Sequence, residues 1–472
     1  MSLGDVVMTA VVWFNYLVLG YFVLINAHYL ILLLVGFKAT RRALREMRWH
    51  DVRRVMQSHL TLPISVITPA YNEEASVAEA VRSLLMLRYP QFEVVVVNDG
   101  STDDTLKVLI ERFALREVPR TFEAVVPCRA IRAVYESDLH SNLVVIDKDN
   151  GGSKADAVNA GINLALYPLF CAIDADSILE DDALLRAVRP FLDEPGVVAV
   201  GGIIRIVNGC EVRGGKMANV RLTHALLPLL QIVEYLRAFL FGRMAWATIN
   251  GLLIVSGGFG LFDKKSVVMA GGYASDSIGE DFELIVRMHH RLREARVPYR
   301  IRFVPDPVCW TEVPESLRVL QRQRNRWQRG LIDTLWRHRK MIGRPRYGVV
   351  GLLALPSFVV FELLGPVIEV SGYLVIPLCA WLGIVNAAFM ALFFTLAVLC
   401  GVLLSVSGVL LEDMAFHRYP RLRDLVLLCV VGVIESFGYR QLNAWWRIRA
   451  SWDYSRGRTG WGEMERRGFG PT

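Results

Sequence analysis

Two short motifs in the second half of the chain combine carboxylates with a cationic, aromatic segment. Gly279–Asp281 places Glu280 and Asp281 at the start of an expected helix over residues 282–295. Gln323–Trp327 follows in an arginine-rich segment just before a long apolar region. A carboxylate such as Asp281 can take a proton from a hydroxyl group. The Trp327 ring offers a flat apolar face to a ligand, although a tryptophan at this place can also simply anchor the chain at a membrane surface.

A second pair of carboxylates, Asp174 and Asp176, follows the apolar run 169–173. Residues two apart at the end of a strand point to the same side. Their oxygens can hold a hard cation, Mg²⁺ or Mn²⁺, and leave positions for diphosphate oxygens. Taken alone, such a pair is more often a turn cap followed by a helix start. Its position beside the other motifs favours the metal site.

Polar residues also follow two earlier strand-like runs. Asp99 ends the run 92–97 and can accept a hydrogen bond from a pyrimidine N–H. Tyr71 and Glu73 follow the run 64–68, where capping a helix is the alternative role. Lys154 lies in a glycine-rich turn that lets the backbone approach a phosphate, and its ammonium supplies a point charge. A solvated surface lysine is the alternative.

These residues need a sheet that brings strand ends together. Short β-branched runs at 64–68, 92–97, 143–147 and 169–173 alternate with helical patterns at 75–87, 103–115 and 154–166. This alternation predicts an α/β fold with a parallel sheet and helices on both faces. Ligands of such sheets bind beyond the carboxyl ends of the strands, where the polar motifs fall.

The composition indicates a membrane protein. Hydrophobic residues make up 53% of 472 residues, the mean hydropathy is +0.35 and the net charge is +7. Residues 6–37 carry no charged side chain, which is long enough for a transmembrane helix, and a basic flank follows them. The positive-inside rule places this flank in the cytoplasm. The seven cysteines have no paired spacing, so we expect free thiols.

The C-terminal part is expected to return to the membrane. Residues 316–340 read as an interfacial helix, and 347–440 have room for four further spans, with two as the alternative. Glu362, Glu369 and Glu435 lie in or near these spans and either line a channel or pair with arginines such as Arg440. The expected regions are a transmembrane helix 1–37, a basic cytoplasmic linker 38–62, a catalytic domain 63–315, an interfacial region 316–346, transmembrane helices 347–440 and a basic cytoplasmic tail 441–472.

Taken together, six motifs resemble those of processive family 2 glycosyltransferases, the membrane-embedded synthases of cellulose, hyaluronan, chitin and poly-N-acetylglucosamine. They occur in the family's order and approximate spacing over residues 65–329: Pro69–Glu74 (PAYNEE), Asn98–Ser101 (NDGS), Gly152–Ala155 (GSKA), Asp174–Asp176 (DAD), Gly279–Asp281 (GED) and Gln323–Trp327 (QRNRW). Single motifs of this length are weak signals, whereas six in order are a strong one. The segment 256–262 lies where the family has a differently spelled acceptor-side strand.

The resemblance implies a GT-A fold, a nucleotide-diphosphate sugar donor, usually a UDP-sugar, and an inverting transfer. By motif, Asp281 is the expected general base. The expected donor-binding residues are Pro69, Tyr71, Glu73, Asp99, Lys154, Asp174 and Asp176, the last two also holding the metal. The acceptor and donor site is expected to include Glu280, Gln323, Arg326 and Trp327.

Three functions follow from this reading. The first is a synthase that extends a β-linked exopolysaccharide and passes it through its own spans in a bacterial-type inner membrane. The second is transfer of one sugar to a lipid or short acceptor, and product size separates these two. The third is a membrane protein that binds a nucleotide sugar without turnover. The expected partners are the donor, a polysaccharide or lipid acceptor and membrane lipid, and no nucleic acid.

Overall fold

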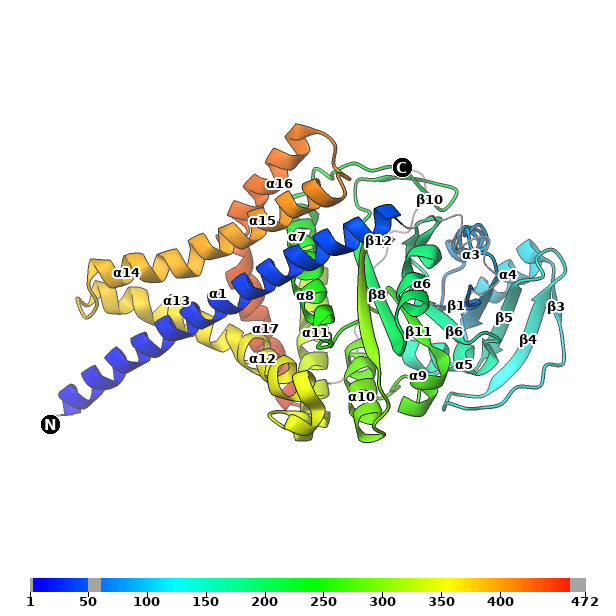
Figure 1. The fold of residues 1–472 in the computed structure, drawn as a ribbon, viewed down its shortest axis with the longest axis horizontal. Helices are drawn as coiled ribbons and strands as arrows, with labels where there is room; N and C mark the ends of the chain where they lie inside the picture. The colour runs from blue at the N-terminus through cyan, green and yellow to red at the C-terminus, as the bar shows by residue number, and fades with distance from the viewer. Residues whose placement is uncertain (1–2, 50–60, 459–472) are drawn as a thin grey trace.

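A computed structural model describes residues 3–49 and 61–458, in which a sheet-based domain and a bundle of apolar helices lie at opposite ends (Figure 1). The domain is built on a ten-stranded mixed sheet. In spatial order its strands are β3 (Leu115–Glu117), β4 (Ile131–Ser137), β5 (Leu143–Lys148), β2 (Phe92–Asn98), β1 (Ile64–Ala70), β6 (Leu169–Ile173), β11 (Phe259–Asp263), β8 (Val197–Ile206), β12 (Arg300–Thr311) and β7 (Ile178–Leu179).

The expected α/β class is confirmed, and the four expected strands are β1, β2, β5 and β6. These four run parallel, as their buried β-branched sequences predicted. The complete sheet is mixed, because β3 and β4 form an antiparallel pair at one edge and β11 runs antiparallel to both β6 and β8. The expected strand at 255–262 begins only at Phe259, after a glycine turn.

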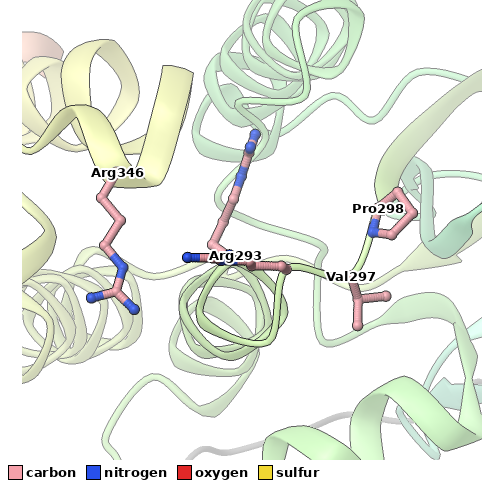
Figure 2. A pocket seen from close by; sticks show the side chains of 5 residues that line it. Arg293, Val297, Pro298 and Arg346 are labelled. Carbon is pink, nitrogen blue, oxygen red and sulfur yellow. The ribbon is translucent and has the colours of Figure 1, made fainter.

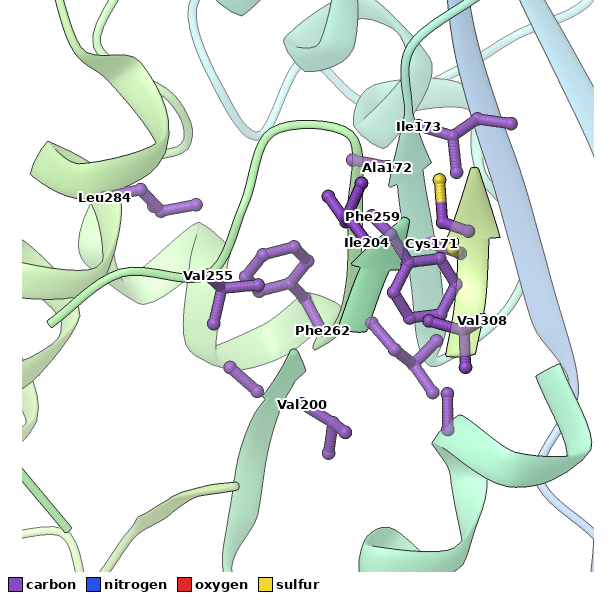
Figure 3. Close-up of a cluster of buried hydrophobic side chains, with 14 of the residues drawn as sticks. Cys171, Ala172, Ile173, Val200, Ile204, Val255, Phe259, Phe262, Leu284 and Val308 are labelled. Carbon is purple, nitrogen blue, oxygen red and sulfur yellow. The ribbon is translucent and has the colours of Figure 1, made fainter. Parts of the chain in front are cut away.

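Helices of the domain follow the strands as the alternation predicted. They are α3 (Val77–Leu85), α4 (Thr105–Phe113), α5 (Lys154–Leu164), α6 (Ala183–Asp193), α9 (Lys264–Ala270) and α10 (Glu280–Glu294), and a small hairpin of β9 (Glu211–Arg213) and β10 (Lys216–Asn219) lies apart from the main sheet. Figure 3 shows the buried side chains where β6, β8, β11 and β12 meet. There the rings of Phe170 and Phe262 stack with centroids 5.3 Å apart.

A layer of helices separates the sheet from the apolar bundle (Figure 1). It contains α7 (Leu226–Arg237), η1 (Ala238–Arg243), α8 (Met244–Thr248), α11 (Leu317–Arg337) and α17 (Tyr439–Ser455). The expected interfacial helix is α11, but it does not lie open on a surface. Leu320, Arg324 and Leu331 on α11 are buried, because α17 and α10 pack against it.

The apolar bundle contains α1 (Leu3–Trp49) and a C-terminal series of helices. These are η4 (Val350–Ala354), α12 (Leu355–Ser357), η5 (Phe358–Leu363), α13 (Gly365–Trp381), α14 (Ala387–Phe394), η6 (Thr395–Leu399), α15 (Cys400–Ala415) and α16 (Leu422–Ile434), preceded by the short turns η2 (Arg339–Met341) and η3 (Pro345–Tyr347). The seven cysteines are free thiols, as expected.

Three helices of the described chain are long and apolar enough to cross a membrane: 5–46, 350–381 and 387–415. The first confirms the expected N-terminal span, which continues as one helix through the basic flank. Two such helices follow the domain, so the preferred number of four is not supported and the alternative of two agrees. With 13 residues, α16 is too short to span. The linker residues 50–60 and the tail from 459 lie outside the described residues.

Candidate active site

The carboxyl ends of β1, β2 and β5 form one edge because their register aligns them. Ala70 pairs with Asn98, and Asn98 pairs with Asp147. Tyr71 and Asp99, each one residue further on, therefore emerge side by side. The Tyr71 ring is 50% exposed, so it is available to a flat ligand, whereas Asp99 is buried.

Asp99 is held by a buried lysine that the motif analysis did not single out. The ammonium of Lys148, which is fully buried, forms an ion pair with the Asp99 carboxylate and another, at 2.6 Å, with Asp156. The Gly151 backbone N–H donates to the same Asp99 oxygen at 3.1 Å. Both donors thus bind the same carboxylate oxygen of Asp99. Lys148 was missed because a lysine at the end of an apolar strand carries no motif.

Pro69 and Glu73 shape the turn after β1. Pro69 is the penultimate residue of β1, and Glu73 lies in the turn that leads to α3. The Glu73 backbone N–H donates to the Thr105 hydroxyl at 2.8 Å, and the Ser76 hydroxyl donates to the Glu73 carboxylate at 2.6 Å. These contacts agree with the capping role that the sequence offered as the alternative for Glu73.

Lys154 and Asp174 meet in the cleft between α5 and the end of β6. The Lys154 ammonium lies 2.5 Å from the Asp174 carboxylate and 2.6 Å from the Gly257 carbonyl oxygen. Burial acts to lower the pKa of Lys154, but the charges of Asp174, Glu280 and Asp281 outweigh it, and the pKa is raised. Lys154 is therefore charged, and it lies near Asp174 as well as near Glu280 and Asp281.

Gly257 joins these residues to Asp281. Its carbonyl oxygen accepts from Lys154, and its backbone N–H donates to the Asp281 carboxylate at 3.0 Å. A Cβ atom at position 257 would lie 3.4 Å from the Lys154 ammonium and 3.6 Å from an Asp281 oxygen. Asp281 and Asp174 are therefore linked to each other through Gly257 and Lys154.

Glu280 adds a second acid beside Asp281 at the N-terminus of α10. Burial, and next the negative charge of Asp281, raise the pKa of Glu280 to about 7. Lys154 and Arg326 act in the opposite direction, which shows that Arg326 of α11 is near enough to act on Glu280. At neutral pH Glu280 is thus close to half protonated, in contrast to an ordinary surface glutamate.

The α11 helix, which carries Gln323, Arg326 and Trp327, packs against the turn before α10 through a contact between two glycines. A Cβ atom on Gly330 of α11 would lie only 3.0 Å from the Gly279 Cα atom. Backbones approach this closely only when both residues lack a side chain. The first residue of the Gly279–Asp281 motif and the helix of the Gln323–Trp327 motif thus pack directly against each other.

On α11, Gln323 is buried whereas Trp327 is partly exposed. The Gln323 side-chain oxygen is buried and has no hydrogen-bond partner in the described part of the chain. Trp327 is 43% exposed, and Arg324 lies over its ring at 4.5 Å. Arg324 is itself fixed by two hydrogen bonds to Glu234 of α7, at 2.6 and 2.8 Å. The Trp327 ring is therefore held in place by Arg324 and remains partly exposed to solvent.

Asp174 and Asp176 are the expected ligands of the divalent cation. One oxygen of Asp174 contacts Lys154, and the other faces the backbone of Gly258, where a Cβ atom would lie 3.6 Å away. Asp174 and Asp176 both act on the thiol of nearby Cys309, whose pKa is raised to about 12 mainly by burial. No set of three or more acidic, histidine or cysteine side chains within 3–49 and 61–458 is arranged to hold a metal. Two carboxylates suit an ion that completes its shell with ligand phosphates and water.

Three contributors to the site besides Lys148 were not predicted from the motifs: Gly257, Gly258 and Arg243. The sequence GGFG was read as part of a strand, whereas Gly257 and Gly258 form the turn that opens the cleft. Arg243, at the end of η1, is close enough for Asp281 to affect it, although burial dominates and lowers the pKa of Arg243 to about 10. Adjacent glycines before a strand were the available signal for the turn, and nothing local marked Arg243.

Comparison with known proteins places the sequence among glycosyl transferases. The profile of Glycosyl transferase family group 2 matches residues 169–416, and that of Glycosyl transferase family 2 matches residues 65–121. The chain is similar to poly-beta-1,6-N-acetyl-D-glucosamine synthase of Staphylococcus epidermidis, with 27% identity over 274 residues, 58% of this chain and 56% of that protein. The synthase of Staphylococcus aureus (strain COL) is 28% identical over 276 residues, with the same coverage.

These matches span little more than half the length of the curated relatives. Among solved structures, the chain is similar to the mannosyltransferase PcManGT from Pyrobaculum calidifontis in complex with GDP-Man and Mn²⁺. The TM-score is 0.49 and the identity 18%, over 92% of this chain and 99% of that one.

Proposed function

The chain belongs to Glycosyl transferase family group 2, and on that premise we propose that it is an inverting glycosyltransferase that extends a β-linked polysaccharide. The donor is a nucleotide-diphosphate sugar, with UDP-N-acetylglucosamine or UDP-glucose as the first candidates. The observation that carries the proposal is the cleft in which Gly257 contacts both Lys154 and Asp281. It provides an acid–base group and a diphosphate-binding cation within reach of one sugar.

The proposed reaction is a single displacement. The acceptor hydroxyl oxygen forms a bond to the anomeric carbon of the donor sugar, while the bond from that carbon to the diphosphate oxygen breaks. Asp281 accepts the hydroxyl proton, and the nucleoside diphosphate leaves with the electron pair. Since no covalent sugar intermediate forms, one carboxylate at this position is enough.

Other residues of the cleft bind and orient the donor. We propose that Tyr71 and Asp99 contact the base and that Lys154 neutralises the diphosphate, which the exposure of Tyr71 and the largely buried position of the Lys154 ammonium support. A Mg²⁺ or Mn²⁺ ion bound by Asp174 and Asp176 would add charge neutralisation at the leaving group. The unpartnered Gln323 oxygen and the exposed face of Trp327 line the proposed acceptor side.

We also propose that the polymer leaves through the apolar bundle, past polar groups between α1, η5 and α17. The Tyr29 hydroxyl lies 3.1 Å from Glu362, and Arg447 pairs with the same carboxylate at 3.0 Å. Glu435 does not fit such a path, since it is buried and paired with Arg237 and Arg440 at 2.8 and 3.1 Å. Pairing with Arg440 was the alternative that the sequence had left open. We propose that the active site faces the cytoplasm, because the basic flank after residue 37 is expected on that side of the membrane.

The decisive experiment uses the purified full chain with labelled UDP-sugars in Mg²⁺ and in Mn²⁺, with UDP release and product mass as readouts. Asp281→Asn should abolish transfer while the dissociation constant of the donor changes less than about threefold. Full activity of this variant would refute the role of Asp281. A product carrying one added sugar would replace polymerisation by single transfer, and donor binding without UDP release would reject both.

A further inference from the structure

An arginine-lined hollow lies at the far end of α10 from the active site (Figure 2). Its volume is about 710 Å³, and it is lined by Arg293, Arg296, Val297, Pro298 and Arg346. Arg293 belongs to α10, and Arg346 comes from the turn that precedes the apolar helix beginning at Val350. Three arginines and no acid face one space, although they come from segments about fifty residues apart in sequence.

Internal contacts fix Arg293 without neutralising it. Its guanidinium carbon lies 5.5 Å from the Tyr299 ring centroid, and its Nε atom is buried without a hydrogen-bond partner among the described residues. Gly348, with a φ of +59°, allows the guanidinium to approach the backbone closely. The neighbouring acid, Glu294, contacts His290 and Arg291 instead. The charge of Arg293 is therefore available to the hollow.

Arg296 occupies a position where glycine is the favoured residue. Its φ is +55°, and the Val297 N–H donates to the Leu292 carbonyl at 3.0 Å, which closes the end of α10. A non-glycine residue in this conformation is strained. Neither Arg296 nor Arg346 forms an ion pair within residues 3–49 and 61–458. The fold thus tolerates a strained, uncompensated arginine at the rim of the hollow.

The end of α10 itself opposes an anion. A helix C-terminus carries about half a negative charge, which attracts a guanidinium on its own account. Three arginines exceed that charge about sixfold, so the hollow remains cationic after the helix is taken into account. Planar guanidinium groups match the oxygens of a phosphate in pairs.

We propose that this hollow binds a phosphate group through Arg293, Arg296 and Arg346, at a site separate from glycosyl transfer. The phosphate belongs either to the headgroup of an anionic lipid or to a soluble anion. Both can reach it, because the hollow is open to solvent and Arg346 lies four residues before the candidate span 350–381.

The test measures binding to the purified full chain in a neutral detergent. One arm titrates short-chain phosphatidylglycerol and the other inorganic phosphate, with the shift in unfolding temperature as the readout in both. Arg296→Gly removes a charge and also relieves the strained conformation. We expect its unfolding temperature without ligand to be equal or higher, and its apparent affinity to fall about fivefold, the value of one basic side chain near an anionic surface.

Two further variants make the result decisive. Arg346→Gln should weaken binding to a similar extent. If Arg296→Gly unfolds at a lower temperature than the unchanged chain, the affinity of Arg346→Gln is the measurement that tests the proposal. Arg300→Gln is the matched control, because Arg300 lines only the adjoining hollow and its charge is paired with Glu194 at 3.1 Å. Loss confined to phosphatidylglycerol identifies a lipid headgroup, and loss in both arms identifies phosphate in general. Unchanged binding in both arms, or an equal loss in the control, would overturn the proposal.

Discussion

The contact between Gly330 and Gly279 predicts how the Gln323–Trp327 motif is coupled to Asp281. A methyl group on Gly330 would lie 3.0 Å from the Gly279 Cα atom and 3.1 Å from its nitrogen. Ordinary contacts between carbon atoms need ~3.5–4.0 Å, so α11 and the turn before α10 must separate by about 0.5–1 Å. Both atoms that the methyl group meets belong to the backbone, so no side chain can rotate away.

Stability and activity should respond differently to Gly330→Ala. Alanine favours the helix by about 1 kcal/mol, while the forced contact costs about 1–3 kcal/mol, so we expect a loss of stability of no more than about 2 kcal/mol. The rate of transfer should fall much further, because a displacement of about 1 Å between reacting groups can cost about a hundredfold. We expect kcat to fall by roughly ten- to a hundredfold.

The assay compares UDP release and thermal unfolding of the same preparation. Gly20→Ala is the matched control, since Gly20 lies in the helix α1 and no atom lies within 4 Å of its added methyl group. The control should retain the rate of the unchanged chain. A Gly330→Ala variant with a normal rate would show that the approach of α11 does not set the geometry at Asp281, and the coupling argued here would be wrong.

Three further predictions concern charge in the same domain. The pKa of Glu280 is raised to about 7 in the folded chain, so protonation of Glu280 stabilises the fold, fully so below the unfolded-state pKa. This stabilisation is lost as the pH rises through 7, so the unfolding temperature should fall between pH 5 and pH 8. Glu280→Gln should flatten that profile. Lys148→Met should destabilise the chain by about 3–5 kcal/mol in urea unfolding, because it leaves the carboxylates of Asp99 and Asp156 without their buried cation, and a loss below 1 kcal/mol would contradict this. Removing divalent cations with a chelator should weaken donor binding at least tenfold in the unchanged chain and much less in Asp176→Asn, as measured by calorimetry; equal losses in both proteins would remove Asp176 from the metal site.

Much of the sheet was predictable because its central strands are buried on both faces. A run such as 94–97 (VVVV) is buried at every position, so it is apolar throughout and the strand is visible in the sequence. The strand β4, next to the edge strand β3, is mostly exposed or half-buried, and β12 carries prolines and arginines, so neither stood out. The count of spans failed for a different reason. Apolar sequence continues into α16, but that helix turns back after 13 residues at the buried ion pairs of Glu435.

The residues of the candidate site were predictable by type, but their connections were not. Motifs select the side chains that touch a ligand, and each of these lies at the end of a local element. The groups that hold them together come from other parts of the chain. Lys148 acts on Asp99, Glu234 on Arg324, and Gly257 on Asp281. A glycine or a buried lysine of this kind leaves no periodic or spacing signal, because only the tertiary contact requires it.

Burial, and next the negative charge of Asp281, explain why Glu280 titrates so high. Asp174, Asp176, Glu280 and Asp281 supply four negative charges when all are ionised, and Lys154, Arg243 and Arg326 offset three of them. A donor diphosphate brings further negative charge into the same space. Repulsion must therefore be relieved either by a proton on Glu280 or by an added cation. If these two compete, the apparent pKa of Glu280 should fall when Mg²⁺ and donor bind together, and the chain should release a fraction of a proton on binding at pH 7. Proton uptake in a calorimetric titration across several buffers would show that the proposed cation does not act on this cluster.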